Sequence, residues 1–245
     1  MDAHLIEVGG LSKRFGGFVA LDDIALAVTA GERVGLIGPN GSGKSTLVNC
    51  LCGALANDGG TVRFAGRDLA GLGAHARTRI GMARTFQLPR PFASMTVLDN
   101  VRVPLLYAAG AQRRPALRDA EIAARCEEFL TLVGLAAAAP RYPRDLTQVE
   151  MRKLELARAL AAQPRLLFAD EPMAGLSHAE VDDIVALLIA LNARGITVIL
   201  IEHIMRAVMR FSERLVVLVS GRKIADGRPE DVVRDRAVEE AYLGR

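Results

Sequence analysis

The feature that most constrains the fold of this chain is a glycine-rich run between a predicted strand and a predicted helix. Its residues are Gly38, Pro39, Asn40, Gly41, Ser42, Gly43, Lys44 and Ser45. Glycine at the first and sixth positions, followed by Lys and Ser, is the spacing of a phosphate-binding loop, or P-loop. Such a loop approaches phosphate oxygens closely and binds them through successive backbone N–H groups at a helix N-terminus. The run therefore predicts a site for the phosphates of a nucleotide.

The polar residues of this loop and an acidic pair further along the chain indicate how the phosphates are handled. Lys44 can reach the β- and γ-phosphates, and the Ser45 hydroxyl can be a ligand of Mg²⁺. A second apolar run, at residues 166–169, ends in Asp170 and Glu171. We expect Asp170 to hold Mg²⁺ through water and Glu171 to act as general base toward the attacking water. The alternatives are a glycine-rich turn without a ligand and an acidic pair on the surface.

The rest of the chain alternates between patterns typical of strands and of helices. Short apolar runs predict strands at residues 24–28, 33–37, 61–64, 166–169, 197–201 and 215–219. Residues 44–52 predict a helix, and Ser177 with Glu180 predicts the capped start of another helix, which ends before Gly195. This alternation predicts an α/β fold with a largely parallel sheet.

The middle of the chain has a different pattern. Residues 96–109, 117–135 and 147–161 are rich in Ala, Leu and Arg, and they predict helices. Prolines mark the connections between them. We therefore expect one domain, residues 1–245, in which a helical subdomain at about residues 88–163 is inserted into a core of about residues 1–87 and 164–245.

Composition excludes several classes of protein. With 245 residues, of which 51% are hydrophobic and 24% charged, the chain has the composition of a globular protein and not of a disordered one. A net charge of +3 is too small to indicate a nucleic-acid partner, and we expect none. The apolar runs are shorter than the ~20 residues of a membrane-spanning helix, and the N-terminus lacks the pattern of a signal peptide. The odd number of cysteines, 3, favours a reducing compartment.

Several further motifs occur in an order that identifies a family. In chain order they are Phe15 before two glycines, the P-loop, Gln87, the pair Asp170 and Glu171, residues 174–177, and His203 after a predicted strand. In this order the motifs resemble those of ATP-binding cassette (ABC) ATPases, over nearly the whole chain. The resemblance implies a P-loop NTPase cassette with a RecA-like core, an antiparallel β subdomain and an inserted α-helical subdomain. Outside this order, Gln87 would be interpreted as a surface residue and Phe15 as a core residue.

The resemblance also implies a role for each site residue, with ATP and Mg²⁺ as cofactors. The residues implied to bind ATP are Phe15, which would stack on adenine, and the phosphate-binding set Gly38, Pro39, Asn40, Gly41, Ser42, Gly43, Lys44, Ser45 and Thr46. The implied Mg²⁺ ligands are Ser45, Gln87 and Asp170. The implied catalytic residues are Lys44, Gln87, Glu171 and His203, of which His203 would contact the γ-phosphate.

Details of four segments resemble one subgroup, the ATPases of branched-chain amino acid importers, and the first of that family's two ATPases in particular. The segments are residues 13–17, 81–87, 201–203 and 240–244. This resemblance implies a peripheral subunit at the cytoplasmic face of the inner membrane, bound to transmembrane permease subunits and, through them, served by a periplasmic solute-binding protein. A second ABC ATPase is the implied partner, and a homodimer is the alternative. An ATPase of a lipopolysaccharide-type exporter and a mainly nucleotide-binding regulatory cassette remain alternative functions.

One motif departs from the family's pattern. The signature that usually reads Leu-Ser-Gly-Gly-Gln is replaced by Leu-Thr-Gln-Val-Glu at residues 146–150. Thr147 and Glu150 keep the spacing of a capping box, so the helix should still begin there. Val149 adds bulk where the family has glycine, and we expect the Glu150 carboxylate to repel ATP by about 3 kcal/mol before screening, at ~5 Å and an effective dielectric of ~20. The sequence therefore predicts a weak signature. Ile204 also stands where the subgroup usually carries Asp.

The altered signature affects the expected assembly. In the family, two cassettes pair head to tail, and each ATP lies between the P-loop of one chain and the signature of the other. With an intact partner, the site built on Lys44, Glu171 and His203 would hydrolyse ATP, and the site completed by Val149 and Glu150 would mainly bind it. We therefore expect a heterodimer with unequal sites.

Overall fold

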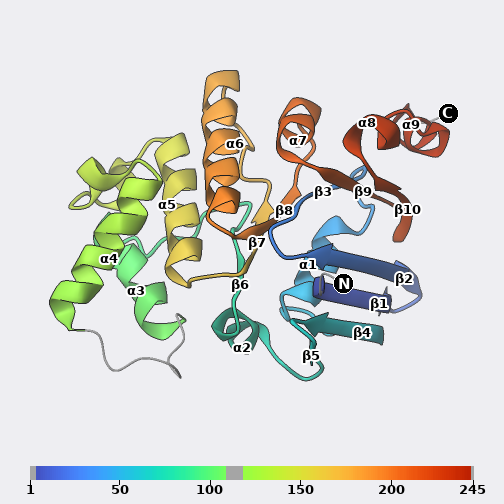
Figure 1. The fold of residues 1–245 in the computed structure, drawn as a ribbon, viewed down its shortest axis with the longest axis horizontal. Coiled ribbons are helices and arrows are strands. Elements are labelled where there is room, and N and C mark those ends of the chain that lie inside the picture. The colour runs from blue at the N-terminus through green and yellow to red at the C-terminus, as the bar shows by residue number, and fades with distance from the viewer. Residues whose placement is uncertain (1–3, 109–117, 244–245) are drawn as a thin grey trace.

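Two β-sheets form the framework of the protein, seen here in a computed structural model that describes residues 4–108 and 118–243 (Figure 1). The first sheet is antiparallel and has the strand order β2-β1-β4-β5. Its strands are β1 (His4–Phe15), β2 (Phe18–Thr29), β4 (Gly59–Phe64) and β5 (Arg67–Asp68). β1 and β2 form a hairpin with a two-residue connection, in which Gly16 has the positive φ, 58°, that tight hairpin turns require.

The second sheet has six strands in the order β10-β9-β3-β8-β7-β6. Its strands are β3 (Arg33–Ile37), β6 (Met82–Arg84), β7 (Leu166–Asp170), β8 (Thr197–Ile201), β9 (Arg214–Val219) and β10 (Arg222–Gly227). All neighbours are parallel except β9 and β10, which are antiparallel. All residues of β7 and β8 are buried, as the uninterrupted apolar runs predicted. The predicted α/β fold with a largely parallel sheet is confirmed.

Helices cover both faces of this second sheet (Figure 1). They include α1 (Lys44–Leu51), α2 (Ala74–Arg79), α6 (His178–Ala193), α7 (Met205–Phe211), α8 (Pro229–Val232) and α9 (Arg236–Leu243). Along β7, Leu166 and Phe168 pack with α1 and the first sheet, whereas Leu167 and Ala169 pack with α6 on the opposite face. The helix α1 therefore lies between the two sheets. No helix within residues 4–108 and 118–243 has the length and apolarity needed to cross a membrane.

A group of helices lies at one side of the molecule, away from the antiparallel sheet (Figure 1). It consists of α3 (Val97–Tyr107), α4 (Asp119–Leu132) and α5 (Gln148–Ala161). These helices agree with the predicted ones, although Ala109 and Leu117 of the predicted ranges lie outside the described residues. Their apolar faces join the core that also contains residues of β7 and α6. The subdomain boundaries near residues 88 and 163 stay a prediction.

The sequence analysis missed β1 and shortened β2 to residues 24–28. The pairing of β1 with β2 shifts register between Val8 and Leu11 and again before Lys13. Each bulge moves the following side chains to the other face of the sheet, so the alternation of apolar and polar residues that predicts a strand is interrupted. The hairpin was therefore invisible to a test based on periodicity.

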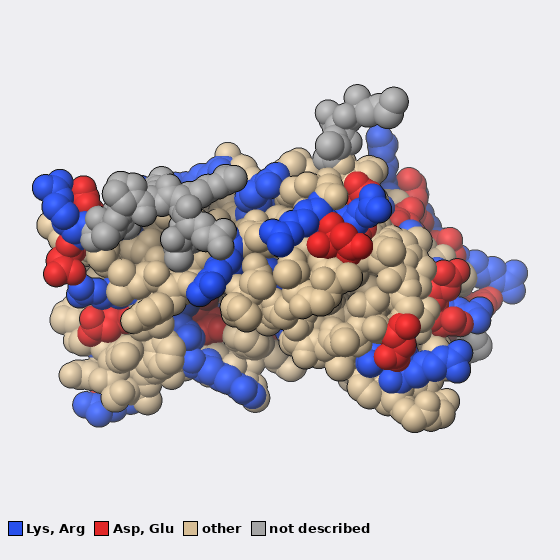
Figure 2. Space-filling model, turned by 90° about the horizontal axis from the view of Figure 1, so that it is seen from below, with Lys and Arg blue, Asp and Glu red and all other residues tan. Residues whose placement is uncertain are grey.

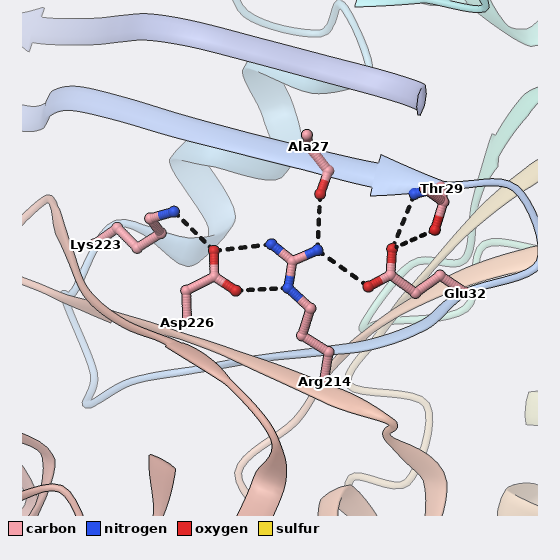
Figure 3. Close-up of polar contacts among 6 residues, drawn as sticks. All are labelled: Ala27, Thr29, Glu32, Arg214, Lys223 and Asp226. Carbon is pink, nitrogen blue, oxygen red and sulfur yellow. Dashed lines mark hydrogen bonds and ion pairs between the residues drawn. The ribbon is translucent and has the colours of Figure 1, made fainter. Parts of the chain in front are cut away.

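Arg214 of β9 fastens the two sheets together (Figure 3). Its Nη1 donates hydrogen bonds to the Ala27 carbonyl of β2, at 2.9 Å, and to Glu32 Oε1, at 3.0 Å. Its Nε and Nη2 bind both carboxylate oxygens of Asp226, at 2.6 and 2.9 Å. The bond to Asp226 raises the pKa of Arg214. Burial raises the pKa of Asp226, but hydrogen bonds from Arg214 and Lys223 lower it by more, so the carboxylate stays charged.

Arg77 of α2 holds the end of α1. The guanidinium is buried and donates to four backbone carbonyls: Cys50 and Leu51 at 2.8 Å each, Leu72 at 2.8 Å and Leu69 at 3.1 Å. The first two carbonyls belong to the last turn of α1, where the helix dipole is negative and carbonyls lack partners within the helix. Arg77 thus fixes the helix whose other end begins at the glycine-rich loop.

Candidate nucleotide-binding site

The glycine-rich loop lies between β3 and α1, as predicted. Gly38 has φ of 152° and Gly43 has φ of 103°. A Cβ atom at Gly38 would lie 2.1 Å from the Leu218 carbonyl oxygen, and one at Gly43 would lie 2.8 Å from the Ala20 carbonyl oxygen. The loop is therefore pressed against β9 on one side and β2 on the other, and only glycine fits at these two positions.

The Lys44 side chain is buried inside the loop. Its Nζ donates hydrogen bonds to the carbonyl oxygens of Gly38, at 2.7 Å, and Pro39, at 3.0 Å, and lies 3.4 Å from Ser42 Oγ. Burial lowers the pKa of Lys44, while the negative charges of Glu171 and Asp170 oppose that shift. The ammonium group is thus held where an anion in the loop would meet it.

The start of α1 suits an anion better than the starts of α3, α5 and α6. Its N-cap is Gly43, with no side-chain hydrogen bond, and its first turn has no acidic residue. In contrast, α3, α5 and α6 have side-chain caps and an acidic residue in the first turn. The N–H groups at the start of α1, next to the exposed Ser45, therefore remain directed toward a ligand. This loop fits phosphate oxygens.

Asp170 ends β7, and its carboxylate is buried beside an arginine that the sequence analysis missed. Arg84 of β6 donates from Nη2 to Asp170 Oδ2, at 2.6 Å, and from Nη1 to Asn49 Oδ1 of α1, at 2.5 Å. The Asp170 N–H donates to Thr85 Oγ1, at 3.1 Å. Asp170 is therefore oriented by β6 and, through Arg84, by α1. Arg84 lies in the segment 81–87 that resembles the family, but its partners could not be predicted, because it pairs through the sheet and not through sequence spacing.

The structure brings together Gln87 and Glu171, two of the predicted site residues. Gln87 Nε2 donates to Glu171 Oε2 at 2.5 Å. Glu171 has φ of 44°, a left-handed conformation that costs a non-glycine residue about 1–3 kcal/mol and that concentrates at functional sites. The buried Arg152 of α5 donates to the Gln87 carbonyl and, at 3.1 Å, to the Ala174 carbonyl. Arg152 thus joins the segments that follow β6 and β7 to the group of helices.

His203 follows β8, and its side chain is 60% exposed. The buried neighbour Glu202 accepts hydrogen bonds from the N–H groups of His203, at 3.0 Å, and Met173, at 3.1 Å. Burial raises the pKa of Glu202, and these hydrogen bonds oppose that shift. Glu202 therefore ties the segment after β8 to the segment after β7. Its role was not predicted, because the resemblance of residues 201–203 to the family does not indicate which distant N–H groups Glu202 accepts from.

Phe15 lies at the end of β1 beside the hairpin turn. Its side chain is 50% exposed, and the Lys13 ammonium lies 5.6 Å from the centroid of its ring. Further along the same hairpin, the Ala20 carbonyl borders Gly43 of the loop. The hairpin is thus anchored beside the loop, and the adenine contact of Phe15 stays a prediction.

The start of α5 contains the segment with the altered signature. Thr147 caps the helix: its Oγ1 accepts from the Glu150 N–H at 3.3 Å, and its own N–H donates to Glu150 Oε2 at 2.8 Å, which confirms the predicted capping box. The repulsion of ATP by Glu150 stays a prediction, but its carboxylate has a cationic partner. Arg141 Nη1 lies 3.0 Å from Glu150 Oε1. The Thr147 N–H, helped by Arg141, lowers the pKa of Glu150, so the carboxylate is charged but largely compensated.

Known proteins resemble this chain in sequence over its length. The pattern of the family described as "ABC transporter" matches residues 21–174, and that of "Branched-chain amino acid ATP-binding cassette transporter" matches residues 222–245. The chain is 40% identical to the high-affinity branched-chain amino acid transport ATP-binding protein BraF of Pseudomonas aeruginosa, covering 100% of this chain and 99% of the relative. It is 38% identical to LivG of Escherichia coli, a protein with the same description, at the same coverage.

Solved structures resemble it equally well. A nucleotide-free ATP-binding cassette from an ABC transporter is 31% identical, with a TM-score of 0.89 and coverage of 99% of this chain and 100% of that chain. A cassette bound to ADP and Pi, described as dimeric, is 27% identical, with a TM-score of 0.81 and coverage of 91% and 98%.

Proposed function

Because this chain belongs to the ABC transporter family, we propose that it is the ATP-binding and ATP-hydrolysing subunit of a transporter that imports branched-chain or other hydrophobic amino acids. The observation that carries nucleotide binding is the Lys44 ammonium, buried in a loop that excludes side chains at Gly38 and Gly43. The names of relatives that align with the whole chain support the class of solute.

Phosphate binding is assigned to the loop and the start of α1. The N–H groups of residues 38–46 and the Lys44 ammonium would bind the phosphate oxygens. Ser45, Gln87 and Asp170 are the proposed ligands of Mg²⁺, and each offers an oxygen atom, the ligand type that this cation prefers. When bound, Mg²⁺ would neutralise charge on the β- and γ-phosphates.

Hydrolysis is assigned to Glu171, whose carboxylate would take a proton from the attacking water. Gln87 lies in the segment that leads from β6 to the helical group, and its Nε2 donates a hydrogen bond to that carboxylate. Lys44 and His203 would stabilise negative charge that develops on the γ-phosphate. Phe15 would stack on the adenine ring.

A permease is proposed to dock in a cavity of about 220 Å³ between α2, β6, α3 and α5. Its lining is mainly apolar and includes Ala74, Met82, Phe86, Pro104, Arg158 and Ala159. Figure 2 shows a depression between the lobe on the left, which contains the helical group, and the rest of the molecule, with Lys and Arg side chains along it.

The proposed assembly pairs this chain with a second ABC ATPase, a heterodimer in preference to a homodimer. It would lie at the cytoplasmic face of the inner membrane, bound to the permease and served by a periplasmic solute-binding protein. The dimeric description of one structural relative supports pairing of two cassettes. The altered segment at residues 146–150 supports unequal partners, because Glu150 and Arg141 already use the donors and charges at the start of α5.

The test is reconstitution of the complete transporter in proteoliposomes, with leucine uptake and ATP hydrolysis measured together. Uptake should require ATP and the binding protein. Glu171→Gln should bind ATP with nearly wild-type affinity and hydrolyse it at least about 100-fold more slowly, because it loses the base. Lys44→Ala should lose most of its ATP affinity. A wild-type chain that binds no ATP would refute the proposal, and ATP-driven transport of lipopolysaccharide without leucine uptake would favour the exporter.

The alternative function is that of a cassette that binds a nucleotide without hydrolysing it and thereby regulates a partner. The observation that favours it is the closed capping box at Thr147 and Glu150, which leaves fewer N–H groups for a partner's phosphate. A complete complex in which Glu171→Gln leaves the ATPase rate unchanged would establish that alternative.

A further inference from the structure

Arg84 contacts both elements that contain proposed Mg²⁺ ligands, α1 and the end of β7, which form the metal side of the site. Its Nη2 lies 2.6 Å from Asp170 Oδ2 at the end of β7, and its Nη1 lies 2.5 Å from Asn49 Oδ1 on α1. The two side chains of the ion pair are only 16% and 7% exposed. A planar guanidinium has donors in a fixed fork, so both partners must keep their places for both bonds to form.

The two partners of Arg84 lie on the two elements that contain proposed Mg²⁺ ligands. Asp170 is itself one of these ligands. Asn49 lies four residues after Ser45 on α1, so the two side chains share one face of that helix. The Arg84 fork therefore fixes the spacing between the Ser45 end of α1 and the end of β7.

The other face of Arg84 borders the proposed docking cavity. The guanidinium carbon lies 5.7 Å from the centroid of the Phe86 ring, and both side chains line the cavity. Phe86 is 48% exposed, which leaves it accessible to a partner. Arg84 Nε is buried and has no hydrogen-bond partner among the described residues, so the terminal nitrogens carry the polar contacts.

We propose that Arg84 is a positioning residue that links the cavity to the metal side of the site. It holds Asp170 and α1 at the spacing that Mg²⁺ with ATP requires, and the position of Phe86 in the cavity affects this spacing through the guanidinium. This inference rests on the proposed function. The alternative is a placeholder role, in which the Arg84 cation only occupies the position of Mg²⁺ beside Asp170. The proposed role differs from it, because Asn49 and the Phe86 ring hold Arg84 independently of Asp170.

The test measures ATP affinity with Mg²⁺ and with EDTA and takes the ratio of the two, the magnesium gain. Arg84→Gln should reduce this gain about tenfold, the effect of one hydrogen bond to a charged group, and leave the affinity in EDTA unchanged. Arg84→Lys keeps the charge but loses the fork, so it should restore the gain only in part. Arg79→Gln, an exposed arginine on α2, is the matched control and should leave the gain at the wild-type value.

Two further variants test the proposed connections without touching the ion pair. Asn49→Ala removes the α1 partner, and Phe86→Ala removes the ring in the cavity; each should lower the magnesium gain several-fold. These variants also decide the case if Arg84→Gln does not fold. A gain that rises in Arg84→Gln would establish the placeholder role and overturn the proposal, as would an unchanged gain in Asn49→Ala and Phe86→Ala. Failure of the wild-type chain to bind ATP at all would instead refute the proposed function.

Discussion

Replacing Arg77 by Met tests whether the end of α1 is held by polar contacts remote from the nucleotide. The substitution removes the guanidinium and retains most of the aliphatic volume. The four carbonyls that accept from Arg77 then lose their donor. Such a loss costs about 1 kcal/mol for each buried carbonyl. Part of this cost is offset, because the substitution also removes the buried charge of Arg77, whose acceptors are all carbonyls. That charge no longer has to be desolvated on folding. We expect a net destabilisation of about 3 kcal/mol.

Urea-induced unfolding at pH 7, followed by circular dichroism, measures the free energy of unfolding. Variants are compared with wild type where the slope of this free energy against urea concentration is the same. Arg79→Met is the matched control, because it makes the same change on the same helix at an exposed position. The control should change the free energy of unfolding by no more than about 0.5 kcal/mol. Arg77→Lys should lower the free energy of unfolding by an amount between those of Arg77→Met and Arg79→Met. An ammonium group lacks the planar fork of donors with which the guanidinium reaches all four carbonyls. If Arg77→Met matched its control, the reasoning about α1 would be refuted.

Three further outcomes are expected. Asp226→Asn should lower stability at pH 7, and the difference from wild type should shrink as the pH falls below the ordinary pKa of an aspartate and through its lowered folded-state pKa. The reason is that a carboxylate whose pKa is lowered in the folded state stabilises above its unfolded pKa and loses that effect as the pH falls; unfolding at several pH values checks this, and a difference independent of pH would contradict it. Gly43→Ala places a methyl group 2.8 Å from the Ala20 carbonyl oxygen, so fluorescent-nucleotide binding should weaken at least about tenfold, and unchanged binding would count against the loop geometry. The purified chain alone should hydrolyse ATP more slowly than its mixture with the partner ATPase, and full activity of the chain alone would contradict unequal sites.

The parts of the fold that could be predicted are those specified by neighbouring residues. The strand β3 and the start of α1 are specified by an apolar run and a glycine spacing, and the starts of α5 and α6 by capping boxes such as Ser177 with Glu180. Each of these signals operates within a few positions of the chain. The β1–β2 hairpin was missed because its bulges interrupt the only local signal that it has.

Contacts that join distant segments could not be predicted. The sequence analysis considered the charge of Glu150 without Arg141, which pairs with it across a turn of the chain that leaves no pattern in the sequence. Likewise, the contact of Gln87 with Glu171 depends on the adjacent parallel strands β6 and β7. The motifs named candidate site residues from local sequence, and the roles of all of them, including Phe15 and His203, stay predictions.

The arginines around the candidate site explain why its motifs alone do not specify its geometry. A nucleotide site must be polar and open, so apolar packing cannot hold its residues from the side that faces the ligand. Arg77 and Arg84 bind α1 from outside the loop, and Arg152 binds the segments that carry Gln87 and Ala174. Each is largely buried, and each joins elements that are far apart in sequence. The groups that would meet ATP are therefore positioned by guanidinium forks that lie outside the glycine-rich loop, and an Arg-to-Lys change at these positions is not a conservative one.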